Sequence, residues 1–495
     1  MGSDKHRVRT IIGRWGIDRA CKAIFVCLVM LWAEAMRADD WPMLRHDPAR
    51  SGRSSDSVGP PFNVAWSVVF PEETIPTRTE PIVADGRVYV GTYQGRLYSL
   101  HATTGEELWS ARLKGPILHS PCVFQNKVYV AGVGGLWALD AQTGKTLWHF
   151  SPHRAGFCTS PLVMQDLVLL GGRDGRFCAV DRATGKLRWS VGTGGPIRTS
   201  AAAIKDTLFF ASEDMHVYAV RLEDGQLLWK SHKLSGQSVR DYYPLLLADR
   251  VIIRTNPVEH FATHIAGDTA FLASQAGLPD NHWQTIDQYL KSSAVFGTPE
   301  KIRAEQAAIR RRLEQYPWLQ TFFILDAKTG ETVCIPPVLY VGGCAGVGNP
   351  PVVVSETQVF VIYRTAYTNF TLGVAPFVGV GLLDVTTGQI EPIFHQHGLQ
   401  VPWDTFWGTA DEAQNLSSAG PMVYFSHQGT LSALDLRNKK LMNLAGRRDT
   451  FGGFRRVDWA LNEWHGPARS SAAIAGEYLY WITGSRVIAV KGEKE

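Results

Sequence analysis

Ala138-Leu-Asp140-Ala-Gln-Thr143-Gly144-Lys-Thr-Leu-Trp148 is the stretch from which the fold can be read. Its template, A-x-D-x-x-T-G-x-x-x-W, returns in the next copy with Ala179, Asp181, Thr184, Gly185 and Trp189. More degenerate copies end at Trp109 and Trp229, so the four tryptophans are 39, 41 and 40 residues apart. A repeat of about 40 residues is typical of propellers and solenoids.

Each copy divides into four short strands. In the copy that ends at Trp148, we predict strands over 120–124, 127–131, 135–140 and 145–150. In the turn between the last two, the Asp140 side chain can accept backbone hydrogen bonds and Gly144 supplies a positive φ at little cost. The tryptophan of the outer strand fills the wedge between radially arranged sheets. We assign these structural roles to Asp140, Gly144, Trp148, Asp181, Gly185, Trp189, Trp229, Trp109 and Trp66.

Counting the copies predicts an all-β, eight-bladed β-propeller of four-stranded blades, with seven blades as the alternative. The first four blades begin near Thr79, Ser120, Ser160 and Ser200. The later four are degenerate, and we place the start of blade 7 at Gly420. Blade 8 lacks a fourth strand, which 62–69 can supply from the other end of the chain. Such closure removes the exposed edges of an open array.

The largest departure from the repeat is an insertion at 256–320, between the second and third strands of blade 5. Thr298-Pro-Glu300 is typical of a helix start, and the helix should continue to Gln315 with an apolar stripe. We interpret the insertion as a small, partly helical cap on the propeller rim. A lid over a ligand or an arm that docks a partner is the alternative.

The long departures share one face of the predicted propeller, because 256–320, 367–376, 402–419 and 446–466 all fall in connections on that side. Aligning the blade starts places arginines at equivalent positions there in blades 1, 4 and 8, with Cys158, Asp241 and Ser418 in blades 3, 5 and 7. Several arginines around a channel mouth favour an anion through bidentate pairing. Pairing with neighbouring blades is the alternative. The predicted ligand-binding set is Arg78, His119, Arg198, Arg240, Asp241 and Arg469.

The N-terminus predicts export. Basic residues precede an apolar run at 23–33 that is followed by small residues, so we expect a signal peptide over 1–35, with an uncleaved anchor as the alternative. An entry segment over 36–61 and a single propeller domain over 62–495 follow. The first 35 residues hold six Lys/Arg and three Asp/Glu, which leaves 44 basic and 43 acidic residues. This balance argues against a nucleic-acid partner.

Five cysteines follow the leader, namely Cys122, Cys158, Cys178, Cys334 and Cys344. Because their number is odd, at least one thiol stays unpaired or pairs between chains. Cys334 and Cys344 are the one pair close in sequence, and five buried thiols are the alternative. Two further patterns are weak: His395 and His397 for a metal, and 451–459 as an aromatic and arginine-containing interface loop.

The repeat and the N-terminal closing strand resemble the quinoprotein (PQQ-repeat) eight-bladed propellers, and Asp39-Asp-Trp-Pro with His46-Asp-Pro-Ala-Arg-Ser-Gly looks like the entry segment of cofactor-free members. The family holds PQQ-dependent alcohol dehydrogenases and non-catalytic scaffolds such as the lipoprotein of the outer-membrane barrel assembly machinery. The resemblance to the dehydrogenases implies adjacent cysteines and a calcium ligand set. No Cys-Cys dipeptide occurs here, and no family motif surrounds the candidates Asn349, Asp404 and Asp411.

We therefore predict an exported, periplasmic or extracellular scaffold that binds a protein or cell-envelope component through its loop-rich face. It should need no cofactor, be monomeric, and be peripheral to a membrane at most. The alternative is a PQQ- and calcium-dependent or metal-dependent oxidoreductase with its site in the central funnel. A polysaccharide-binding or hydrolytic protein rests on tryptophan content alone.

Overall fold

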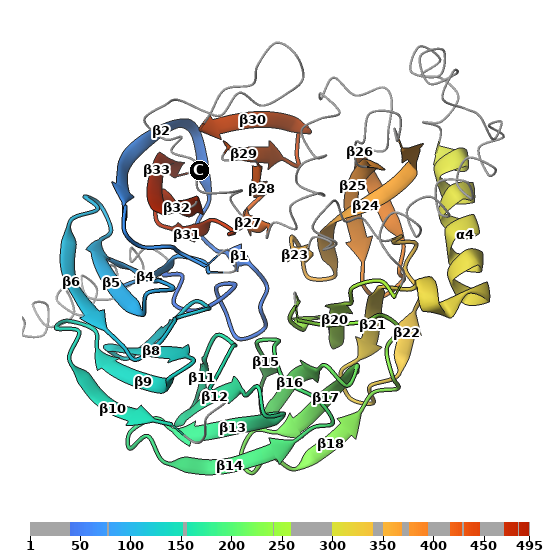
Figure 1. The fold of residues 1–495 in the computed structure, drawn as a ribbon. Coiled ribbons are helices and arrows are strands. Elements are labelled where there is room, and N and C mark those ends of the chain that lie inside the picture. The colour runs from blue at the N-terminus through green and yellow to red at the C-terminus, as the bar shows by residue number, and fades with distance from the viewer. Residues whose placement is uncertain are drawn as a thin grey trace, which may run out of the picture.

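Eight β-sheets stand radially around a common centre in the computed structural model (Figure 1). The structure describes residues 40–76, 79–151, 156–240, 242–258, 299–339, 350–368, 376–394, 416–427, 430–445, 470–483 and 485–494. Seven sheets have four strands and one has five. The predicted count of eight blades is therefore confirmed, and so is the four-stranded blade.

Blades 1 to 4 each follow the sequence repeat as an antiparallel meander from the centre outward. Their strands are β3 (Ile82–Ala84), β4 (Arg87–Gly91), β5 (Arg96–His101) and β6 (Glu107–Arg112); β7 (Cys122–Phe124), β8 (Lys127–Gly132), β9 (Gly135–Asp140) and β10 (Thr146–Phe150); β11 (Leu162–Met164), β12 (Leu167–Gly171), β13 (Arg176–Asp181) and β14 (Leu187–Gly192); β15 (Ala202–Ile204), β16 (Thr207–Ser212), β17 (His216–Arg221) and β18 (Leu227–Lys230).

Blades 5 to 8 keep the same order despite their degenerate sequence. Their strands are β19 (Leu245–Leu247), β20 (Arg250–Arg254), β21 (Phe322–Asp326) and β22 (Thr332–Cys334); β23 (Val352–Val353), β24 (Gln358–Thr368), β25 (Pro376–Asp384) and β26 (Ile390–Phe394); β27 (Ser417–Ala419), β28 (Met422–His427), β29 (Thr430–Asp435) and β30 (Lys440–Ala445); β31 (Ala473–Ala475), β32 (Tyr478–Thr483), β33 (Arg486–Lys494) and β2 (Val58–Val69).

The ring closes where the sequence predicts, because β2 is the outer strand of blade 8 and pairs antiparallel with β33, with Trp66 opposite Ala489. A second N-terminal strand, β1 (Arg53–Ser54), pairs in parallel with β27 and gives blade 7 its fifth strand. The N-terminal strands β1 and β2 therefore join the start of the propeller to blades 7 and 8 and close the ring.

Blade 7 begins earlier than predicted. Ser418 lies in the middle of β27, the first strand of the antiparallel meander of this blade, where it corresponds to Val83 of blade 1 and not to Arg78. Gly420 has φ 52 and forms the turn after that strand, as Gly86 with φ 71 does in blade 1. The alignment that put Ser418 at the channel mouth was wrong, because Ser-Ser-Ala lacks the β-branched pattern of an inner strand and hid its register.

Adjacent blades are joined by a contact in which the tryptophan of one blade packs on the turn glycine of the next blade. Each indole N–H donates to a carbonyl of the next blade, as Trp109 does to Ala141 at 3.0 Å and Trp148 to Arg182 at 3.1 Å. The ring lies flat on the turn glycine, so that a Cβ on Gly185 would come within 2.7 Å of the Trp148 ring. The same contacts join Trp66 to the Gly105 turn, Trp189 to the Gly225 turn and Trp229 to the Gly330 turn.

The aspartate of the template stabilises the turn on which the tryptophan packs. Asp140 Oδ1 accepts the backbone N–H of Gln142 at 3.1 Å and both the N–H and the hydroxyl of Thr143 at 2.8 Å. These bonds from Thr143 hold the pKa of Asp140 below its ordinary value. The turn that contains Gly144 is thereby held in place under the Trp109 ring.

The described cysteines Cys122, Cys158, Cys178 and Cys334 are all free thiols, and the first three are buried. Cys334 stands where the repeat has tryptophan, with its Sγ 2.7 Å from the place of a Cβ on Gly388 of the next blade. The smaller residue fills the same wedge. Cys344 and the leader cysteines lie outside the described residues, as do 1–39, 395–415 and 446–469 with the patterns predicted there.

The described part of the insertion contains the helix α4 (Pro299–Gln315), followed by the short η2 (Pro317–Leu319). The predicted helix is confirmed within the described chain. Figure 1 shows α4 standing at the rim beside blades 5 and 6. Gln306 Nε2 donates to the Ile390 carbonyl at 3.0 Å and Arg310 Nη2 to the Gly388 carbonyl at 2.6 Å. The helix thus covers the outer edge of blade 6, which an exposed strand would leave open to foreign pairing.

Removing both hydrogen bonds between α4 and the outer edge of blade 6 should leave the backbone of that edge less protected from solvent. We expect Gln306→Ala with Arg310→Ala to raise amide hydrogen exchange in α4 and β26 about tenfold or more, since each lost bond contributes about 1 kcal/mol. Exchange in blades 1 to 4 should not change. Arg303→Ala is the matched control, because its ion pair to Glu300 stays within the exposed face of the helix. Uniform exchange in all variants would show that the helix is held by other contacts.

Candidate functional site

The entry segment passes along the wall of the central channel and contacts most blades in turn. Trp41 pairs with Val83 of blade 1 through bonds of 2.8 and 2.9 Å, and Pro42 O accepts the N–H of Val123 of blade 2 at 2.7 Å. Further carbonyls of the segment accept N–H groups of the inner strands of blades 4, 5, 6 and 7, namely Ala203, Leu246, Val353 and Ser418. Because these N–H groups belong to the inner strands of the blades, the entry segment lies inside the central channel.

Two arginines of this segment are completely buried. Arg50 donates through Nε to the Ala201 carbonyl at 2.7 Å and through Nη1 to the Leu44 carbonyl at 2.6 Å. Burial lowers the pKa of Arg50 to about 10. Arg45 faces Glu80 with Nη1 and Oε1 3.7 Å apart, and its guanidinium lies 5.8 Å from the centre of the Tyr243 ring. None of its three guanidinium nitrogens has a hydrogen-bond partner among the described residues.

The mouth of the channel opens on the entry face, which we define as the side where the innermost strands begin and the turns between second and third strands lie. A pocket of about 250 Å³ lies there. It is lined by Pro76, Tyr93, Leu118, His119, Cys158, Arg173, Arg198 and Arg240. The structure therefore brings His119, Arg198 and Arg240 of the predicted set to one pocket, together with Cys158. Arg78, Asp241 and Arg469 lie outside the described residues.

Arg173 belongs to this pocket and was missed from the sequence. It follows the second strand of blade 3, where Tyr93 stands in blade 1 and Glu213 in blade 4. Aligning this turn across the blades, as was done for the blade starts, would have found it. Arg173 also approaches Cys158, whose thiol donates to the Ile197 carbonyl at 3.5 Å. Burial raises the pKa of Cys158, and the hydrogen bond with Arg173 opposes that shift.

Arginine side chains are the main charged groups of the pocket's described lining. Three arginines line the pocket, and no carboxylate is among the described lining residues, while Asp241, which follows Arg240, lies outside the described part of the chain. Arg173 and Arg198 form no ion pair with any described residue, whereas Arg96, Arg188, Arg250 and Arg437 each face a carboxylate within 4 Å. An unpaired guanidinium in a concave site attracts planar oxyanions, because its N–H groups match them two at a time.

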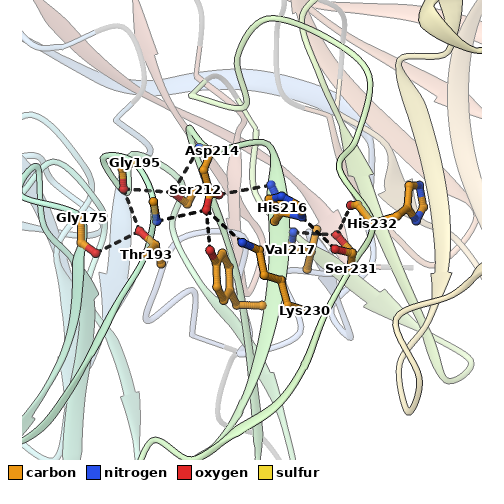
Figure 2. A network of polar contacts seen from close by, with 12 residues as sticks. Gly175, Thr193, Gly195, Ser212, Asp214, His216, Val217, Lys230, Ser231 and His232 are labelled. Carbon is orange, nitrogen blue, oxygen red and sulfur yellow. Dashed lines mark hydrogen bonds and ion pairs between the residues drawn. The ribbon is translucent and has the colours of Figure 1, made fainter.

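A polar network fixes the link that leads to Arg198 (Figure 2). Asp214 Oδ2 accepts the Tyr218 hydroxyl at 2.5 Å and the Gly194 N–H at 3.1 Å, and Lys230 Nζ lies 3.5 Å away. Thr193 Oγ1 and Ser212 Oγ both donate to the Gly195 carbonyl, at 2.7 and 3.0 Å. The blade 3 to blade 4 connection is thereby tied to a turn of blade 4, which holds this rim of the pocket in place.

The donor set of the pocket does not fit calcium with PQQ, the group that the fold family implies. Calcium takes oxygen ligands, chiefly carboxylates and carbonyls, and the lining offers cationic side chains instead. Among the described residues no group of three or more His, Cys, Asp or Glu side chains could hold a metal ion. We derive no reaction step through such a group.

Comparison with known proteins agrees with this architecture. The family model for the outer membrane protein assembly factor BamB matches residues 63–190 and 123–256. The chain is 30% identical over 185 residues to a quinohemoprotein alcohol dehydrogenase of Comamonas testosteroni, and 28% identical over 175 residues to BamB of Moranella endobia. Residues 63–256 thus match the BamB-type, PQQ-like repeat family, and the eight-bladed propeller fold agrees with this match.

These relatives match only in part. The matched stretches cover 32% and 30% of this chain, and 26% and 43% of the dehydrogenase and of BamB. The crystal structure of the Comamonas testosteroni dehydrogenase superposes with a TM-score of 0.55 at 14% identity, covering 94% of this chain and 82% of the other, and shows the fold alone. In the described part of the chain, no helix is long and apolar enough to cross a membrane.

Proposed function

We propose that the protein is an exported, non-catalytic scaffold that binds a protein or a cell-envelope component through its entry face. The observation that carries this proposal is the pocket at the channel mouth, whose described lining contains three arginines and no carboxylate. Relatives named as BamB, an assembly factor of the outer membrane, are consistent with it. Relatives named as quinoprotein dehydrogenases leave the oxidoreductase alternative open at the level of the family.

Two features of the described chain support a binding face over a reaction centre. The insertion reaches the entry face, because Ser235 Oγ of the blade 4 to blade 5 link donates to the Pro317 and Gln320 carbonyls at 2.9 and 2.7 Å. Trp318 beside this anchor remains 50% exposed, and Tyr316 packs edge-on against it. Exposed aromatic residues near arginines are frequent among the residues that dominate protein interfaces.

A photo-crosslinking amino acid at Tyr93 tests this proposal in the native cell envelope. Tyr93 lines the pocket and is 44% exposed. We expect one defined adduct from Tyr93 and a loss of at least tenfold in that adduct when Arg198→Glu reverses the charge beside it. The probe at Lys186, an exposed residue of the tight turns on the opposite face, is the matched control. Equal adducts from both positions, or none from either, would contradict the proposal.

A further inference from the structure

We propose that the central channel is a binding site for an extended peptide, and that the chain fills this site with its own entry segment. The site consists of the channel-facing edges of the first strands of the blades and of the buried surroundings of Trp41, Arg45 and Arg50. The edge residues that bond to the entry segment do not line the pocket on the entry face. Peptide binding in the channel therefore does not depend on the proposed scaffold function.

In six blades, one backbone N–H group points into the channel from the same position of the first strand. In blade 1 this residue is Val83, the middle residue of β3, which pairs with Val88 of β4. Because β3 pairs with β4 along its other edge, the N–H and C=O groups of Val83 are left to face the channel. The equivalent residues, which have the same register to their second strands, are Val123, Ala203, Leu246, Val353 and Ser418. We call these six N–H groups the channel donors.

Carbonyl groups of the entry segment meet the channel donors in chain order. The donor and acceptor residues of blades 1, 2, 4, 5, 6 and 7 are Val83 to Trp41, Val123 to Pro42, Ala203 to Pro48, Leu246 to Ala49, Val353 to Ser51 and Ser418 to Gly52, at 2.7 to 3.0 Å. In blade 8 a side chain contributes instead, because Asp56 Oδ2 accepts the Gly476 N–H at 2.7 Å. Backbone pairing with an open sheet edge is a recurring mode of peptide recognition. The entry segment is therefore held as a peptide ligand is held.

Side chains of the entry segment add sequence specificity to this backbone pairing. Trp41 and Arg50 are both fully buried. The Trp41 indole N–H donates to Glu80 Oε2 at 3.4 Å, and Arg50 Nε donates to the Ala201 carbonyl at 2.7 Å. Both acceptors belong to the blades and not to the entry segment. The ligand class that fits the channel is thus a peptide that directs its carbonyls outward and carries an arginine and a tryptophan at these places.

Gly52 is the position at which one substitution removes the entry segment from the channel and leaves the channel donors unchanged. Its φ is 65, and a Cβ on it would overlap the Arg45 guanidinium. Gly52→Val therefore prevents the segment from packing within its own chain. Gly86→Val is the matched control, because Gly86 has φ 71 but nothing lies within 4 Å of a Cβ there. The control has similar backbone strain and keeps its entry segment in place.

A fluorescein-labelled synthetic peptide with the sequence of residues 40–54 tests the proposal on the full-length variants. We expect it to bind Gly52→Val at one site per chain, and not to bind Gly86→Val or the unmutated protein, whose channels are filled. The same peptide with Arg50→Gln should bind at least about tenfold more weakly, because it loses hydrogen bonds from a charged donor. No binding to folded Gly52→Val, or equal binding to Gly86→Val, would overturn the proposal.

Hydrogen exchange in the unmutated protein decides the question if Gly52→Val does not fold. Release of the entry segment as one ligand exposes all six channel donors together. Their protection factors should therefore agree within about twofold, although they belong to six blades. The N–H groups of Ile82 and Ala84 alternate with that of Val83 and face β4, so they should exchange more slowly. Channel donors that each exchange at the rate of their own blade would overturn the proposal.

Discussion

Trp148→Ala is expected to lower the free energy of unfolding by about 3 kcal/mol, which is the low end of the range for replacing a large aromatic residue in a packed site. The substitution removes the ring that lies on Gly185 and the indole hydrogen bond of 3.1 Å to the Arg182 carbonyl. It also opens the wedge between blades 2 and 3, where Tyr129 packs against the ring at a centroid distance of 5.9 Å. Urea unfolding followed by tryptophan fluorescence measures the loss.

The neighbouring residue provides the control for this prediction. Leu147 precedes Trp148 on β10 and is 49% exposed, so Leu147→Ala should change the stability by less than about 0.5 kcal/mol. A second variant tests the contact itself. Gly185 has φ 70, and an added methyl group would meet the Trp148 ring at 2.7 Å. Gly185→Ala should therefore cost more in the unmutated protein than in Trp148→Ala, where only backbone strain remains. Additive losses would show that the two residues do not form the lock.

The features of the fold that could be predicted are those that depend on residues close together in the sequence. Asp140, Gly144 and Trp148 act within one turn and across one neighbouring blade, so their spacing predicts the strands and turns of blades 1 to 4. The helix α4 could also be predicted, because three consecutive residues mark its start in the sequence. Closure by β2 followed from the missing strand in blade 8.

The rest depends on contacts that no local pattern encodes. Nothing about Arg45 or Arg50 in the sequence indicates that they are buried in the channel, because their partners Glu80 and Ala201 are 35 and 151 residues away. Ser418 was misplaced for a different reason, because Ser-Ser-Ala lacks the β-branched pattern of an inner strand and so does not mark β27 in the sequence. The pocket was partly predictable, since the blade-start alignment found Arg198 and omitted Arg173 on an adjacent turn.

Glu80→Gln is expected to destabilise the protein by about 3–5 kcal/mol, the usual cost of leaving one charge of a buried ion pair uncompensated. Both Glu80 and Arg45 have fully buried side chains. Oε2 of Glu80 accepts the Arg45 backbone N–H at 2.8 Å and the Trp41 indole N–H at 3.4 Å, so the carboxylate joins the entry segment to blade 1. Glutamine has the same size as glutamate and keeps an acceptor oxygen, so the loss of stability measured by urea unfolding reports the effect of the missing charge.

An exposed ion pair and a paired substitution separate this charge effect from a loss of packing. Glu477 faces Lys491 at 3.2 Å on the surface, so Glu477→Gln should have little effect, because solvent screens such pairs. Arg45→Met combined with Glu80→Gln should recover much of the stability lost in Glu80→Gln alone, since the guanidinium group that faces Glu80 is then removed together with the carboxylate. If the double variant is instead as unstable as the sum of the single ones, the entry segment is held by its backbone bonds and the shape of Arg45. The Arg45–Glu80 charge pair would then contribute nothing specific to closing the channel.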